Sequence, residues 1–129
     1  MTEKFEIYKC EICGNIVQVL KRGVGELVCC GEAMHNFKPQ HEEETSLGEK
    51  HNPKIEEING ETFVHVKSHP MINEHYIEFI EAFTKDKSSM FIKFFNPNDV
   101  AKVKVPFAKD DIDAIELCNV HGLWSSKDY

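Results

Sequence analysis

The chain has 129 residues, of which 41% are hydrophobic and 29% charged, as in a soluble globular protein with one ordinary domain, or with a small metal-stabilised module and a second domain. Its formal net charge of -7 disfavours nucleic acid as the main partner. Residues 1–6 lack the apolar run of a signal peptide and no later stretch is long enough to cross a bilayer, so we expect a cytoplasmic protein with no membrane partner.

Residues 1–37 are expected to form a small unit held together by a metal ion. Four of the chain's 5 cysteines lie here in two pairs, Cys10 with Cys13 and Cys29 with Cys30. In a reducing cytoplasm, cysteines are more often metal ligands than disulfide partners, and an odd number cannot all be paired. A unit this short has little core of its own, so the two pairs predict a tetrahedral four-sulfur site for iron or zinc.

The second cysteine pair has no spacer. Neighbouring side chains diverge, so binding one metal ion through both Cys29 and Cys30 should distort the tetrahedron. This favours iron over the usual zinc ribbon, and a structural zinc site stays open as the alternative.

Residues 38–50 look like a linker, because they contain Pro39, an acidic run over residues 42–44 and a turn-like segment ending at Gly48. The segments that follow favour strands. Two strand-like runs flank Asn59-Gly60, which is a strong hairpin signal.

Further strand-like segments follow the hairpin. Residues 76–83 fit a strand or a short helix, whereas residues 89–95 and 101–107 favour strands, the latter with Val103 and Val105 on one face. Short strands separated by turn signals predict an all-β fold, with a β-sandwich over residues 51–129.

A thiol and an imidazole lie three residues apart in Cys118-Asn119-Val120-His121, close to the end of the chain. Such a pair is a weak signal by itself, but three further histidines have contexts that could complete a site: His51, His69 and His75. Four imidazoles and one thiolate favour a transition metal over calcium or magnesium. Five protein ligands would leave one position of an octahedral ion open for chemistry.

With these motifs in view, the whole chain resembles the desulfoferrodoxins, the two-iron class of superoxide reductases. The matching stretches are residues 8–15, 25–30, 49–51, 69–71, 75–77 and 116–124. Each stretch alone is modestly specific, but their combination in this order is very specific.

The resemblance implies a desulforedoxin-like, rubredoxin-type N-terminal domain over residues 1–37 with a distorted Fe(Cys)4 centre, and an immunoglobulin-like β-sandwich over residues 51–129 with a second iron. The implied ligands of the first iron are Cys10, Cys13, Cys29 and Cys30, and those of the second are His51, His69, His75 and His121 in the equatorial plane with Cys118 on the axis. It also implies a homodimer, superoxide as substrate and an external electron donor such as rubredoxin.

Two charged residues next to a ligand are the candidate catalytic residues. Lys50 immediately precedes His51 and is expected to attract the superoxide anion and help to deliver a proton. The resemblance makes Glu49 the carboxylate that can occupy the open position in the ferric state. Trp124 is interpreted as a core residue.

Two other classes of function stay open beside the enzyme. The chain could be an electron-transfer protein whose N-terminal iron exchanges electrons with a rubredoxin-like partner, or a zinc-stabilised binding module without redox chemistry. Peroxide formation without oxygen release separates the enzyme from the carrier, and a colourless protein would favour the zinc module.

Overall fold

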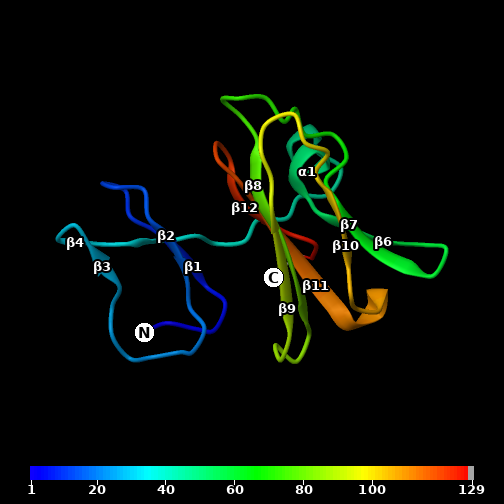
Figure 1. Ribbon diagram of the computed structural model, residues 1–129. Helices are drawn as coiled ribbons and strands as arrows, with labels where there is room; N and C mark the ends of the chain where they lie inside the picture. Colours follow the sequence, from blue (N-terminus) through cyan, green and yellow to red (C-terminus); the bar gives the residue numbers. More distant parts are fainter. Residues whose placement is uncertain (128–129) are drawn as a thin grey trace. The chain divides into compact units, whose positions relative to one another are not determined.

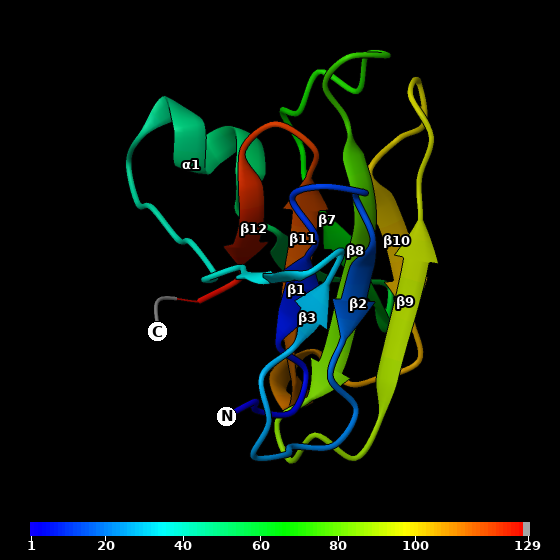
Figure 2. The same ribbon diagram turned by 90° about the vertical axis from the view of Figure 1, so that its left-hand side faces the viewer.

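The computed structural model describes residues 1–127, which form two compact units, Met1–Lys38 and the chain from Pro39 onward (Figures 1 and 2). Both units are built from antiparallel strands. No helix in the described part of the chain is long and apolar enough to span a membrane.

The N-terminal unit contains two small sheets. Its strands are β1 (Ile7–Lys9), β2 (Ile16–Gln18), β3 (Val28–Cys29), β4 (Glu32–Ala33) and β5 (His35–Asn36). Strand β1 pairs with β2 on one side and β5 on the other, and β3 and β4 form a separate hairpin. Strands of two or three residues supply few backbone bonds, so we expect this unit to depend on its cysteines for stability.

The second unit is a sandwich of two antiparallel sheets. Its strands are β6 (Lys54–Ile58), β7 (Glu61–His65), β8 (Ile77–Thr84), β9 (Met90–Phe94), β10 (Lys102–Val105), β11 (Ile112–Cys118) and β12 (Gly122–Ser125). One sheet has the order β10-β7-β6 and the other β12-β11-β8-β9. Apolar side chains of both sheets, among them Val64, Val103, Ile80 and Ala114, pack into one core. The predicted all-β class and immunoglobulin-like sandwich are confirmed.

The hairpin predicted at Asn59-Gly60 is present, with Ile58 paired to Glu61 across a two-residue turn. Asn59 and Gly60 both have positive φ, 53° and 80°, as this turn requires. The ambiguous segment 76–83 lies mostly in β8, a strand between β11 and β9. Residues 79–83 are buried in succession, so both faces of the strand are covered and its apolar residues do not simply alternate with polar ones.

A short helix, α1 (Ser46–His51), occupies part of the segment expected to be a linker. Thr45 caps it, because its hydroxyl accepts a hydrogen bond from the backbone N–H of Gly48 at 2.9 Å. The buried Asn52 ends it and bonds both backbone groups of Glu42, donating to the carbonyl and accepting from the N–H. The glycine that indicated a turn instead allows the helix to pack closely on the backbone of Glu42.

We expect Gly48→Ala to destabilise the second unit by about 2 kcal/mol, because the added methyl group would clash with the backbone carbonyl of Glu42. The measurement is denaturant unfolding of the variant and the parent. Gly25→Ala is the matched control, because a methyl group there meets no atom within 4 Å. Equal losses in the two variants would contradict the close packing of α1.

A 3-10 turn, η1 (Lys109–Asp111), leads into β11. Helix α1 and η1 are the two helical elements within residues 1–127. These strand ends and loops determine where the candidate ligands lie.

Candidate metal centres

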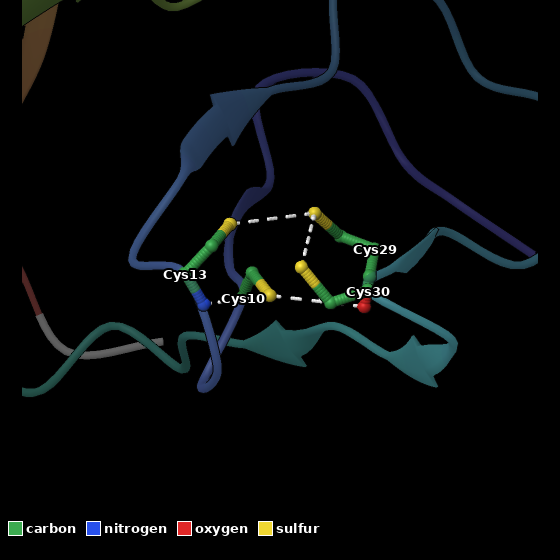
Figure 3. A group of neighbouring side chains, drawn as sticks. All are labelled: Cys10, Cys13, Cys29 and Cys30. Atoms are coloured by element: carbon green, nitrogen blue, oxygen red, sulfur yellow. Dashed lines mark hydrogen bonds between the residues drawn. The ribbon is translucent and has the colours of Figure 1, made fainter.

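The four N-terminal cysteines converge with their sulfur atoms facing one another (Figure 3), and all four sulfurs lie within 4.8 Å of each other. Cys13 Sγ is 3.6 Å from Cys29 Sγ, which is 4.0 Å from Cys30 Sγ. Cys30 has a left-handed backbone, with φ of 54°. This conformation accompanies the convergence of two adjacent side chains, which the sequence alone would lead one to expect to diverge.

The close approach of the four thiols changes the ionisation of three of them, Cys10, Cys29 and Cys30. The backbone N–H of Cys13 donates to Cys10 Sγ at 3.4 Å, and this bond is the main reason that the pKa of Cys10 is lowered to about 6. The pKa of Cys30 is raised to about 12, chiefly because its sulfur shares hydrogen bonds with Cys13 and Cys10. Four thiolates so close repel one another, so they ionise together only when a metal ion compensates their charge.

The second cluster is assembled from loops at the ends of the sandwich strands. His51 ends α1, His69 and His75 lie in the loop before β8, Cys118 ends β11, and His121 precedes β12. Ligand atoms of His51, His69, His75 and Cys118 all lie within 4.8 Å of one another.

His121 joins this group through its Nδ1 atom, which lies 3.2 Å from His75 Nε2 and 4.0 Å from Cys118 Sγ. His69 Nε2 is 3.3 Å from the same sulfur. The five predicted donors are therefore brought together. Cys118 is buried and His121 exposed, so the sulfur lies on the inner side of the cluster.

Burial favours the neutral, metal-binding form of three of the imidazoles, those of His51, His69 and His75. Burial, followed by the neighbouring His75, lowers the pKa of His69 to about 3, and burial also lowers the pKa of His51 and of His75. The ring of His51 contacts the Leu47 carbonyl through Nδ1 at 2.8 Å. This contact assigns the proton to Nδ1 and leaves the buried Nε2 as an acceptor, for which residues 1–127 provide no hydrogen-bond partner.

Comparison with known proteins places both clusters in one family. The family model Desulfoferrodoxin, N-terminal domain, matches residues 2–37, and the model Desulfoferrodoxin matches residues 43–127. The desulfoferrodoxin of Syntrophotalea carbinolica is 42% identical over 129 residues, covering 98% of this chain and 99% of that protein. The chain belongs to the desulfoferrodoxin family.

Two further similarities concern the units. The desulforedoxin of Megalodesulfovibrio gigas is 56% identical over 34 residues, which cover 26% of this chain and 92% of that protein. The crystal structure of the superoxide reductase from Treponema pallidum matches 98% of this chain and 100% of its own, with a TM-score of 0.72 and 26% identity. Family membership implies two iron centres, and the four-thiol and imidazole–thiol donor sets fit iron.

Two residues that support ligands of the second centre, Trp124 and Gln40, were not recognised in this role from the sequence. Trp124 is fully buried as predicted, but it also stacks on His51, with ring centroids 4.9 Å apart, and its Nε1 donates to the His121 carbonyl at 3.1 Å. Gln40, in the expected linker, donates to the same carbonyl at 2.8 Å. These contacts fix ligand orientation. No sequence motif contains Gln40, so nothing in the sequence indicated its role. Trp124 lies in the same motif as Cys118 and His121, and this position could have indicated a contact with the site.

The two candidate catalytic residues lie on α1 and are exposed. The positive charge of Lys50 contributes to lowering the pKa of His51, His69 and His75, so its field acts at the cluster. Glu49 instead lines a groove of about 310 Å³ that also contains the carboxylates of residues 42–44. Its carboxylate is not part of the ligand cluster in the described residues.

Proposed function

We propose that this protein is a superoxide reductase that converts superoxide to hydrogen peroxide at the imidazole–thiol centre. One observation carries the proposal: the four histidines and Cys118 converge, and the lone pair of the buried His51 Nε2 is available to bind a metal ion. The reaction consumes superoxide, one electron and two protons and yields one hydrogen peroxide, with no oxygen released. The four histidines and Cys118 would hold a ferrous ion, which would supply the electron, and the thiolate of Cys118 would increase its electron donation.

The chain's own residues bring in the anion and its protons. The positive charge of Lys50 offsets the repulsion between the superoxide anion and a chain with net charge -7. Its ammonium group can also donate a proton, through water, to the product. For Glu49 we propose the role of an exchangeable carboxylate in the oxidised state. Its present place in the acidic groove requires α1 or its side chain to move for that role.

The cycle needs an external reductant, for which we propose a rubredoxin-like protein. We also propose a homodimer, on the family resemblance, and a cytoplasmic location, because all five cysteines are free thiols. The proposed domains are residues 1–37 for the Fe(Cys)4 centre and 51–129 for catalysis, joined by residues 38–50. The rate of electron transfer from purified rubredoxin to the oxidised protein tests the proposed donor. The molar mass from light scattering tests the proposed dimer.

The test of the activity is the product yield with excess reductant. A reductase gives about one peroxide per superoxide and no oxygen, whereas dismutation gives about half as much peroxide together with oxygen, as the balance of electrons requires. Oxygen release at the dismutation ratio would refute the proposal.

For Lys50→Ala we expect the rate constant for the reaction with superoxide to fall about tenfold and to depend less on salt, because a steering charge is lost. Stopped-flow or pulse radiolysis at several ionic strengths measures both. Lys104→Ala is the control, since it removes another exposed lysine, on β10, where the amine pairs with Glu61. Equal rates in the two variants would remove the steering role of Lys50.

A further inference from the structure

His75 is a candidate ligand that lies outside the strands, in the loop before β8. It ends a small turn in which the N–H of Ile72 donates to the His75 carbonyl at 2.9 Å and the N–H of His75 donates back at 3.0 Å. These bonds shape the turn, but they do not attach it to the rest of the sandwich. The ladder between β11 and β8 stops short of it, at the pair Cys118 and Ile77.

Asn119 continues that ladder beyond its last backbone pair. Its backbone N–H donates to the Tyr76 carbonyl at 3.2 Å, and the N–H of Tyr76 donates to the side-chain Oδ1 at 2.9 Å. The side-chain Nδ2 then donates to the Glu74 carbonyl at 3.2 Å. One amide side chain therefore bonds the residues on both sides of His75.

We propose that Asn119 is a positioning residue for the second centre, where its side chain takes the place of a strand's backbone and fixes His75 against Cys118 and His121. The short distance between His75 Nε2 and His121 Nδ1, 3.2 Å, depends on this register. Partners that orient ligands in this way commonly change metal affinity by about 10- to 100-fold. The inference rests on the metal site of the proposed function and not on superoxide chemistry.

The side chain of Asn119 is exposed, so its truncation leaves no cavity in the core and the variants should fold. Asn119→Ala removes both side-chain bonds, whereas Asn119→Asp keeps an acceptor for the Tyr76 N–H and loses the donor to Glu74. Asn59→Asp makes the same charge change in the β6–β7 turn and serves as the control.

The experiment follows loss of iron from the complete, iron-loaded protein to a chelator, using the visible absorption of the second centre and the metal content. We expect Asn119→Ala to lose second-centre iron at least about tenfold faster than the parent, with the first centre and Asn59→Asp unchanged. Asn119→Asp should fall between Asn119→Ala and the parent. If Asn119→Ala loses iron at a rate within about twofold of the parent, the proposal is overturned. It is also overturned if Asn119→Asp loses iron as fast as Asn119→Ala.

Hydrogen exchange of the Tyr76 amide in the complete, iron-loaded protein tests the same bond without a superoxide assay, so it decides the proposal even if the proposed activity fails. Protection should fall about tenfold in Asn119→Ala and be partly restored in Asn119→Asp. Unchanged protection in Asn119→Ala overturns the role of Asn119.

Discussion

Replacing Cys118 by serine should abolish the thiolate-to-iron absorption of the second centre and slow the reaction with superoxide more than about 100-fold. Cys118 is the one thiol among the five converging donors, and it is buried beneath the exposed His121. Serine keeps the size of the side chain but binds iron weakly and donates little electron density. Visible spectroscopy and pulse radiolysis measure the two effects.

The control is Ile58→Ser, which changes an exposed side chain at the end of β6, in the β6–β7 hairpin. Its absorption and rate should equal those of the parent, and in both variants the first centre should keep its spectrum. Retention of the second-centre absorption in Cys118→Ser would mean that the thiol is not a ligand.

Cys10→Ser should remove the first centre and the order of the N-terminal unit together. A four-thiolate site in a small domain contributes on the order of 10 kcal/mol to folding, and the short strands of this unit cannot replace that amount. Cys10 is buried, and its sulfur accepts the N–H of Cys13, so its loss affects both the metal and the local backbone. The measurements are iron content and the dispersion of the unit's amide resonances.

Ile12→Ser is the control for this change, because Ile12 lies between two ligand cysteines and is 58% exposed. It should retain the first centre. A folded N-terminal unit in iron-free Cys10→Ser would show that the strands suffice without the metal.

The parts of the fold that rest on local chemistry could be predicted from the sequence. The hairpin at Asn59-Gly60 needs positive φ at two positions, and the alternation at Val103 and Val105 follows the pleat of a strand. The four-cysteine cluster was predictable from its two pairs, whereas the five donors of the second cluster could be assigned only with the help of the family resemblance.

The features that were not predicted depend on individual side-chain contacts that no sequence pattern reveals. Helix α1 is too short for a hydrophobic period to identify, and it forms because Thr45 caps it and Asn52 binds the backbone of Glu42. The bonds from Asn119 to Glu74 and Tyr76 join positions more than 40 residues apart. The place of Glu49 beside the acidic groove likewise depends on the packing of this helix.

We propose that the imidazole–thiol centre, and not the four-thiol centre, reacts with superoxide. The most direct measurement adds one equivalent of superoxide to the fully reduced protein and records which absorption returns. We predict that the second-centre band returns first, with one peroxide formed for each superoxide consumed. Return of the four-thiol band alone, or oxygen release with no change in either band, would contradict this account.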